Sequence, residues 1–445
     1  MAPSPERIPG PACAPGASIR FKFDGRTISG VEGDSVCSAL HASGERVLMR
    51  SIKYHRPRGY SCGTGKCASC LVRVDGTPNV RACVTPARDG MVVETQNAFP
   101  SARRDFFAVV DKVYRRDFDY HEKFIHPRVL TPLYNAVIRR MAGFGKLPDL
   151  KPISRSRVRP TIIKREVDVL VVGAGPAGLA AAAAAAEGAA TVLLAEEADR
   201  EGGSLLLHRD VGGRDGTLVA AELLARVRDA GGEVLASSVA FGCYLTDGVG
   251  NKMPAPGIVA VLTHERIIEV KAKALVVASG YHETPALFPG NDLPGVMGAR
   301  AALILLHKHG VLAGQRVALS APATRHAGED LAKAGADVVA WGESPVVEAM
   351  GGTHVERVRL ADGRELRVDC VLYAGDETPR VELLQQCGAP FVASGWVLVP
   401  DPSKLPPGVF AAGDVLGASS PLDAMASGEA AGESAAAFAR TVRPL

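Results

Sequence analysis

Four of the nine cysteines in this 445-residue chain lie close together and are spaced as metal ligands are. Cys62, Cys67, Cys70 and Cys83 follow the pattern C-x4-C-x2-C-x12-C, with the first three on the loop SCGTGKCASC. The C-x4-C-x2-C spacing is typical of plant-type [2Fe–2S] proteins. The two glycines of this loop let it wrap closely and direct backbone N–H groups inward. The pattern predicts an iron–sulfur cluster held by the four thiolates.

Zinc is the alternative metal, because four thiolates also bind it tetrahedrally. Structural zinc sites favour paired knuckles, and this spacing does not contain them. The [2Fe–2S] interpretation is therefore favoured. The remaining cysteines are expected to be ordinary apolar side chains: Cys13, Cys37, Cys243, Cys370 and Cys387.

A second group of residues forms a glycine-rich turn between a buried-strand pattern and an alanine-rich helix. It reads Gly173-x-Gly175-Pro176-x-Gly178. In dinucleotide-binding folds the first glycine makes the turn, the second lets the backbone approach a pyrophosphate, and the third permits close packing of helix on strand. The helix N-terminus adds N–H donors and a positive dipole end. The turn therefore predicts a dinucleotide site.

Three other segments indicate which dinucleotide binds. The strand TVLLAEE ends at Glu196, where a carboxylate can bind the ribose hydroxyls, with Glu197 as an alternative. The segment ALVVASG, ending at Gly280, is typical of the strand that closes a flavin domain. The segment VFAAGDVLG supplies Gly413 and Asp414, an aspartate placed to bind the ribityl chain of FAD. Together these features predict an FAD site.

A second strand–helix–strand pattern begins at Arg316, but it contains no glycine between Gly314 and Gly328. Backbone there could not easily approach a pyrophosphate. This region is expected to be structural or to bind another ligand, so NAD binding there is disfavoured. Asp414 favours FAD over NAD or ATP as the bound cofactor, because a ribityl-binding carboxylate has no role with those two ligands.

The elements that must position these residues follow from hydrophobic periodicity. Residues 18–31 read as two strands around Asp24-Gly25, a hairpin signal. A helix is expected over Asp34–Ser43, with Asp34 as its N-cap, and strands over 71–74 and 91–94. From residue 167 onward strands alternate with helices, which indicates parallel sheets. The predicted fold class is α/β: an N-terminal β-grasp [2Fe–2S] ferredoxin-like domain, then a flavoprotein fold of two dinucleotide-binding domains, as in glutathione reductase.

The predicted domain organisation divides the chain into five parts. They are a disordered tail over 1–17, the ferredoxin-like domain over 18–97, a helical or extended linker over 98–165, an FAD-binding domain over 166–292 and 376–445, and an NAD-binding-like Rossmann domain over 293–375.

Composition excludes several classes of protein. The formal net charge is +3, so no global basic field favours nucleic acid. No apolar run approaches the length of a membrane span. The proline-rich N-terminus has no apolar core typical of a secretion signal, so a cytoplasmic location is expected, where clustered cysteines are more often metal ligands than disulfides.

Catalytic side chains do not stand out. The segment beside the flavin motif reads EGGSLLLH, without the Cys-x-x-Cys of a disulfide reductase. No Ser/His/Asp or paired-carboxylate arrangement is apparent. The sequence thus provides carriers for electrons and no candidate base for a substrate.

Longer stretches resemble one known family. They are RSIKYHRPRG (50–59), PNVRACVTPARDGMVVETQN (78–97), EGGSLLL (201–207) and ASGYHETPALFPGNDLPGVM (278–297). Over residues 18–440 the chain resembles the α subunit of heterotetrameric sarcosine oxidase and its relatives, the multi-subunit proline, hydroxyproline and opine dehydrogenases and hydrogen cyanide synthase. The resemblance implies that Gly203 and Ser204 also contact the cofactor.

Two departures from the family pattern affect what the resemblance implies. The sarcosine oxidase α subunit lacks the cluster cysteines at the matching loop, whereas this chain has all four. Its long form also continues into a folate-binding domain, which is not expected here because this chain stops at Leu445. In this family the amine is oxidised at a flavin on a separate β subunit, a further small subunit can be present, and an FMN can lie at the subunit interface.

The resemblance therefore implies an electron-transfer α subunit of an amine or amino-acid dehydrogenase or oxidase complex. Electrons would pass between a β-subunit flavin, the cluster and the bound FAD. One alternative is a stand-alone NAD(P)H-dependent flavin and iron–sulfur reductase, which the altered second turn disfavours. Two others are a hydrogen cyanide synthase-type subunit and a scaffold with a purely structural nucleotide.

Overall fold

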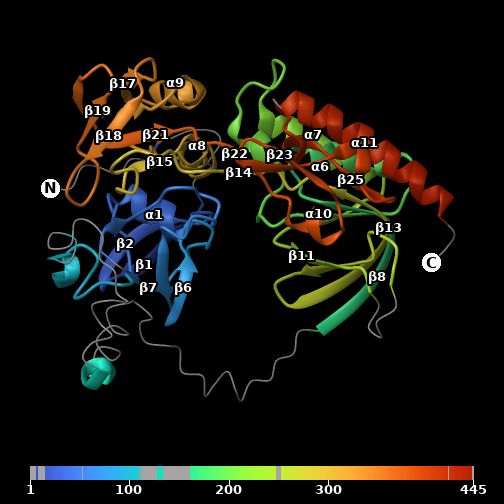
Figure 1. Cartoon of the computed structure of the whole chain (residues 1–445), viewed down its shortest axis with the longest axis horizontal. Helices are drawn as coiled ribbons and strands as arrows, with labels where there is room; N and C mark the ends of the chain where they lie inside the picture. The colour runs from blue at the N-terminus through green and yellow to red at the C-terminus, as the bar shows by residue number, and fades with distance from the viewer. Residues whose placement is uncertain are drawn as a thin grey trace. The chain divides into compact units, whose positions relative to one another are not determined.

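A computed structural model describes residues 7–8, 16–52, 54–109, 111, 128–133, 161–246, 252–418 and 420–442. The chain divides into two compact units (Figure 1). Unit 1 comprises Met1–Ser156 and Glu283–Asp376, and unit 2 comprises Arg157–His282 and Glu377–Leu445. The tail predicted over 1–17 and the linker predicted over 98–165 lie largely outside the described residues. The predicted domain boundaries stay predictions.

The N-terminal part of unit 1 is a five-stranded sheet with the strand order β2-β1-β7-β5-β6. Alternating burial in β1 places Ile19, Phe21 and Phe23 in the core. Asp24 and Gly25 both have positive φ, 46° and 79°, as the tight turn of a right-twisted hairpin requires. The strands and helix of this module are β1 (Ser18–Phe23), β2 (Arg26–Val31), α1 (Val36–Ala42), β3 (Met49–Arg50), β4 (Pro57–Arg58), β5 (Leu71–Val74), β6 (Thr77–Arg81) and β7 (Val92–Glu94).

The N-cap of helix α1 lies one residue later than predicted. Ser35 is the N-cap, and its side chain accepts a hydrogen bond from the Ser38 backbone N–H at 3.0 Å. Asp34 instead accepts hydrogen bonds from the Ser38 hydroxyl and from the Val31 backbone N–H. The prediction of Asp34 as cap was wrong because both neighbours are good capping residues, and only tertiary context decides between them.

The second part of unit 1 is a four-stranded parallel sheet with the order β15-β21-β16-β17, joined to a small antiparallel sheet β18-β19-β20. Its elements are β15 (Val296–Gly298), α8 (Ala299–Leu303), η4 (Ile304–Lys308), β16 (Arg316–Leu319), η5 (Pro322–Thr324), α9 (Arg325–Lys333), β17 (Asp337–Trp341), β18 (Val346–Met350), β19 (Arg357–Leu360), β20 (Glu365–Arg367) and β21 (Cys370–Tyr373). The cluster loop of the first part packs against it, as described below.

Unit 2 is a seven-stranded sheet ordered β10-β9-β8-β13-β12-β11, with β25 also pairing with β13. Strands β8, β9, β10, β13 and β25 run parallel, and β11 and β12 are antiparallel additions. The elements are β8 (Thr161–Val172), α6 (Pro176–Glu187), β9 (Val192–Ala195), η3 (Gly203–Leu207), α7 (Gly216–Asp229), β10 (Glu233–Leu235), β11 (Val239–Tyr244), β12 (Ile258–Leu262), β13 (Arg266–Val277), α10 (Glu382–Gln386), β23 (Phe391–Ser394), β24 (Val397–Pro400), η6 (Pro402–Lys404), β25 (Val409–Ala411), η7 (Gly413–Leu416) and α11 (Pro421–Thr441).

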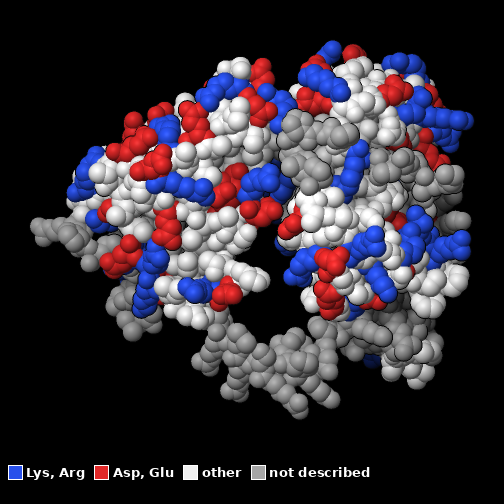
Figure 2. All heavy atoms as spheres, turned by 180° about the vertical axis from the view of Figure 1, so that it is seen from behind, with Lys and Arg blue, Asp and Glu red and all other residues white. Residues whose placement is uncertain are grey.

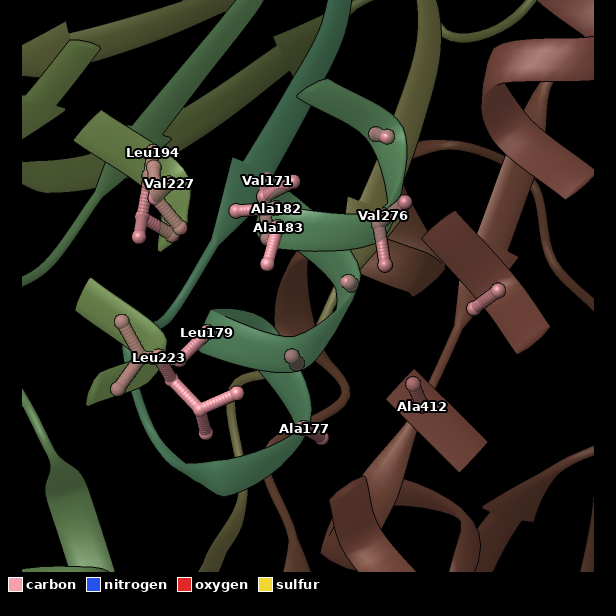
Figure 3. Packing of buried hydrophobic residues seen from close by; sticks show 14 of the residues in the cluster. Val171, Ala177, Leu179, Ala182, Ala183, Leu194, Leu223, Val227, Val276 and Ala412 are labelled. Carbon is pink, nitrogen blue, oxygen red and sulfur yellow. The ribbon is translucent and has the colours of Figure 1, made fainter. Parts of the chain in front are cut away.

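Helix α6 lies in the middle of the unit 2 core, with its alanines between the sheet, α7 and α11. In Figure 3, Leu223 and Val227 of α7 lie on one side of the α6 backbone, together with Leu194 and the side chain of Leu179. On the opposite side of α6, the backbone of α11 contacts the backbone of α6. A Cβ on Gly428 would lie 2.0 Å from the Ala177 carbonyl oxygen. The small residues of both helices therefore hold α6, and with it the glycine-rich turn, in a fixed position.

Surface charge is mixed on both units. On the face shown in Figure 2, the described basic and acidic side chains are interspersed over each unit. This face therefore offers no extended patch of one sign to a polyanion. Among the described residues, no helix is both long enough and apolar enough to cross a membrane.

Candidate cofactor sites

The four clustered cysteines come from one loop and one following turn of unit 1. Cys62, Cys67 and Cys70 lie on the loop between β4 and β5, and Cys83 follows β6. Cys70 and Cys83 are buried, and the other two are partly exposed at the outer end of the loop. The hairpin β5–β6 thus returns the fourth thiol to the first three.

Left-handed backbone makes the tight wrap of this loop. Gly63 and Gly65 have φ values of 69° and 74°, and Ala68 has a φ of 57°. Such values suit glycine and are uncommon for alanine. A Cβ on Gly63 would lie 2.5 Å from the Tyr60 hydroxyl, so glycine is required there for space as well as for backbone conformation. The glycines predicted to wrap the loop do so.

The four thiols shift one another's pKa values. Cys62 accepts from Cys67 and Cys83, which lowers the pKa of Cys62, and Cys70 accepts from Cys83, which lowers the pKa of Cys70. The pKa values of the donors Cys67 and Cys83 are raised by the same bonds and by burial. The four sulfurs thus face one another as one group. Four thiols so placed could supply two ligands to each iron of a [2Fe–2S] cluster.

The loop also supplies a backbone donor to one of its sulfurs. The Thr64 backbone N–H points at the Cys62 sulfur, 3.5 Å away, which is the kind of donor that stabilises a thiolate. The donor set and the loop conformation therefore fit a two-iron cluster.

The cluster loop packs against the inserted parallel sheet, a contact that sequence reasoning missed. The Tyr60 hydroxyl donates to the Ala301 carbonyl at 3.0 Å, and the Ser61 carbonyl accepts from the Gly298 N–H at 3.0 Å. The Ser61 and Tyr373 hydroxyls lie 3.3 Å apart. Burial, followed by the nearby cysteine sulfurs, raises the pKa of Tyr60. The residues immediately before Cys62 thus cover the start of α8.

The glycine-rich turn of unit 2 has the geometry that its sequence predicts. Gly173 has a φ of 99°, and a Cβ there would lie 2.4 Å from the Ala278 carbonyl oxygen. A Cβ on Gly178 would lie 1.7 Å from the Gly173 carbonyl oxygen. Gly175, the N-cap of α6, has no atom within 4 Å of its Cβ position, and Pro176 begins the helix. The first and third glycines are therefore needed for packing, whereas the second borders open space.

The other predicted flavin residues converge on the same turn. A Cβ on Gly203 would lie 2.7 Å from the Gly175 Cα, and Ser204 is next to it in η3. Gly413 has a φ of 78°, and a Cβ there would lie 2.6 Å from the Cβ of Ala177. Asp414 follows in η7, half-buried. Segments more than 200 residues apart in sequence thus border one turn, which is the cradle a dinucleotide requires.

Glu196 and Glu197 have different environments. Glu196 is 8% exposed, and its carboxylate accepts hydrogen bonds from the Ala174 N–H at 2.6 Å and the Ala198 N–H at 2.8 Å. Burial raises its pKa, although both hydrogen bonds oppose this shift. Glu197 is exposed and pairs with Arg380. Glu196, whose carboxylate accepts a hydrogen bond from Ala174 of the turn, is the better placed of the two to bind a ribose.

Arg380 is a site residue that sequence reasoning missed. Its backbone N–H donates to the Gly280 carbonyl at 3.0 Å, its carbonyl accepts from the Ser279 hydroxyl at 2.7 Å, and its guanidinium bonds to His282 at 3.1 Å. Gly280 itself has a φ of 72° and nothing near its Cβ position. A lone arginine 100 residues after Gly280 carries no sequence signal, so only the fold reveals it.

The turn that follows β16 differs in its backbone from the glycine-rich turn of unit 2. It runs through Ser320, Ala321 and Pro322, and the space beside Ala321 is filled by Gly342 from the end of β17. Pro322 has no N–H to donate. Whether this turn binds a ligand stays a prediction.

Two family sequence models match the chain. The 2Fe-2S iron-sulfur cluster binding domain matches residues 16–98, and the FAD binding domain matches residues 168–208. The chain therefore contains a [2Fe–2S]-binding domain and an FAD-binding domain, and both predicted cofactors are confirmed at this level.

Curated relatives and a solved structure extend the comparison. Sarcosine oxidase subunit alpha of Rhizobium meliloti is 34% identical over 347 residues, which are 72% of this chain and 34% of that protein. Hydrogen cyanide synthase subunit HcnA of Pseudomonas aeruginosa is 38% identical over 89 residues, which are 20% of this chain and 85% of that protein. The chain spans about a third of the length of the sarcosine oxidase relatives that it matches.

The fold is also that of a solved protein. The crystal structure of L-proline dehydrogenase from P. horikoshii matches with a TM-score of 0.72 at 23% identity, over 97% of this chain and 75% of that one. Together with the two family matches, this confirms the predicted fold class, a ferredoxin-like domain joined to a flavoprotein fold.

Proposed function

Because the chain belongs to the family of the sarcosine oxidase α subunits and their relatives, we propose that it is the electron-transfer subunit of an amine or amino-acid dehydrogenase or oxidase complex. The observation that carries this proposal is the presence, in one chain, of a four-thiol cluster loop and a glycine-rich flavin turn. When bound, the cluster supplies one-electron and the FAD two-electron transfer to and from a flavin on a partner β subunit.

We assign the ligands residue by residue. Cys62, Cys67, Cys70 and Cys83 hold the cluster. Unit 2 holds FAD through the turn and the segments that border it, namely Gly173, Gly175, Pro176, Gly178, Glu196, Gly203, Ser204, Gly280, Gly413 and Asp414. The convergence of these segments on one turn supports the assignment.

The partner and the location belong to the same proposal. The matched relatives are themselves subunits, which supports a partner chain. That this partner carries the amine-oxidising flavin, with an FMN shared at the interface, is what the family membership adds. A cytoplasmic location is proposed because four reduced thiols are needed to assemble the cluster.

The proposal is tested by purifying the chain alone and together with its co-purifying subunits, and by measuring amine-dependent reduction of a dye. We expect activity only in the complex, and we expect a Cys83→Ala complex to lose dye reduction while its β subunit still reduces its own flavin with amine. Full amine-dependent activity from the isolated chain would contradict the subunit assignment. Rapid bleaching of the isolated chain's flavin by NADH would instead favour a stand-alone reductase.

A further inference from the structure

Two cysteines outside the cluster lie in direct contact in unit 2. The sulfurs of Cys243, in β11, and Cys387, the C-cap of α10, are 2.8 Å apart, although 144 residues separate them in sequence. Both side chains are buried, at 8% and 1% exposure. A disulfide bond is about 2.05 Å long, so the two sulfurs would need to approach only slightly for an oxidant to join them. Both cysteines are free and buried, as expected of ordinary apolar side chains, but their contact was not predicted.

Backbone contacts hold the two thiols in register. The Cys243 backbone N–H donates to the side-chain carbonyl of Gln386 at 2.8 Å. The Cys387 N–H donates to the Leu383 carbonyl at 3.0 Å, which closes the last turn of α10. Cys243 is also held from its own sheet, since it pairs with Val259 of β12. The pair is therefore fixed from both elements, and its proximity follows from the packing of α10 on β11.

The hydrogen bonds make the two sulfurs unequal. The Cys387 thiol donates to the Cys243 sulfur, and the Cys243 thiol donates to the Pro256 carbonyl at 3.1 Å. Accepting the bond from Cys387 lowers the pKa of Cys243, and donating it, with burial, raises the pKa of Cys387. Cys243 is therefore the first to lose its proton, and the thiolate is the reactive form.

We propose that Cys243 and Cys387 form a reversible disulfide when the chain meets a hydroperoxide, and that this cross-link restrains a segment bordering the flavin site. The Cys243 thiolate attacks one peroxide oxygen, the O–O bond breaks, and a sulfenic acid and one water form. The Cys387 sulfur then attacks the Cys243 sulfur, and the S–O bond breaks to release a second water. Two thiols are oxidised and one hydrogen peroxide is reduced, and a dithiol reductant reverses the reaction.

The segment that the cross-link would restrain is Arg380–Cys387. At its start, Arg380 bonds to Ser279 and Gly280 and pairs with Glu197, and at its end lies the thiol pair. A disulfide would add a covalent link between the end of this segment and β11, beside the hydrogen bond from the Cys243 N–H to Gln386. Because the Arg380–Cys387 segment borders the proposed FAD site, a covalent link at its end should slow the release of flavin. This consequence rests on the proposed FAD residues, whereas formation of the disulfide does not.

The disulfide itself is tested by peptide mapping of the full chain after hydrogen peroxide treatment and thiol alkylation. We expect one cross-linked species that joins the Cys243 and Cys387 peptides and disappears with dithiothreitol. Cys243→Ala and Cys387→Ala should each abolish it, and either variant suffices if the other fails to fold. Cys370→Ala, which removes a different buried thiol, should leave it unchanged. Recovery of both peptides singly alkylated after peroxide treatment would overturn the proposal.

The effect on the flavin is tested by the rate at which free FAD appears in mild denaturant. The oxidised wild-type chain should release FAD severalfold more slowly than the reduced chain, and both alanine variants should release it at the reduced rate under either condition. An equal redox effect in the variants would contradict the restraint. Neither measurement uses an amine or a partner subunit. Both results can therefore be interpreted even if the proposed electron-transfer function is wrong.

Discussion

The two cofactor sites of this chain are built from different kinds of atoms. The cluster site consists of four side-chain sulfurs, and its backbone only brings them together. The proposed flavin site consists mainly of backbone atoms around a glycine-rich turn, with Glu196 as its main buried side chain. The first site should therefore be sensitive to loss of a functional group, and the second to addition of a methyl group.

Adding a methyl group at Gly178 should have the largest effect. In Gly178→Ala the new Cβ would lie 1.7 Å from the Gly173 carbonyl oxygen, and neither backbone can move without breaking the β8–α6 packing. We expect unit 2 to lose about 3 kcal/mol of stability or more and to purify without FAD, while iron in unit 1 is retained. Denaturant titration with flavin and iron assays measures this. A stable variant with full FAD content would contradict the packing argument.

Removing a thiol should abolish the other cofactor alone. Cys83→Ala leaves three sulfurs, so we expect loss of iron and of the cluster absorbance with normal FAD content. Cys37→Ala is the matched control, because Cys37 is a buried thiol near the cluster that lies outside the ligand spacing. Its pKa is raised by burial and then by the charges of Cys70 and Cys62. Iron loss in the control, or full iron content in Cys83→Ala, would show that the ligands are assigned wrongly.

Gly175→Ala separates binding from folding in the flavin site. Its Cβ would meet no atom within 4 Å and its φ is −77°, so alanine fits the backbone. We expect unchanged or slightly higher stability, by about 0.5 kcal/mol, and FAD affinity about tenfold lower because the methyl group projects where the pyrophosphate approaches. Flavin titration of the apoprotein gives the affinity. Unaltered FAD binding would mean that the pyrophosphate lies elsewhere.

Glu196→Gln should have the smallest effect on FAD affinity of the three substitutions in the proposed flavin site. The amide can still accept one of the two backbone hydrogen bonds, but its NH2 group faces the other donor, which costs about 1–3 kcal/mol of stability. FAD affinity should fall severalfold. Glu197→Gln is the control, since this exposed ion pair with Arg380 is worth about 0–1 kcal/mol. Stronger loss of FAD in the control would reverse the assignment of the ribose-binding carboxylate.

The difference between the sites also explains what could be predicted from sequence. Side-chain ligands appear directly as spacing, so Cys62 to Cys83 could be assigned from sequence. Backbone sites appear as glycines, and Gly173 and Gly178 occupy the positions that the pattern requires. The hairpin at Asp24-Gly25 was predictable for the same reason, because its turn needs two residues of positive φ.

What could not be predicted depends on contacts between distant segments. Arg380, the hydroxyl contact of Ser61 with Tyr373 and the Cys243–Cys387 pair each join residues at least 98 positions apart. No local pattern records such contacts, since each partner alone is an ordinary residue of its strand or loop. The prediction of the α1 N-cap was wrong for a more local reason. Asp34 and Ser35 are adjacent capping residues, and only the tertiary fold decides between them.

The central claim, that one chain carries both an iron–sulfur cluster and a flavin, is tested most directly by the absorption spectrum and the cofactor content of the purified chain. We expect flavin bands with iron–sulfur shoulders and, per chain, two irons, two acid-labile sulfides and one FAD, without zinc. A colourless chain that contains one zinc and no flavin would contradict it.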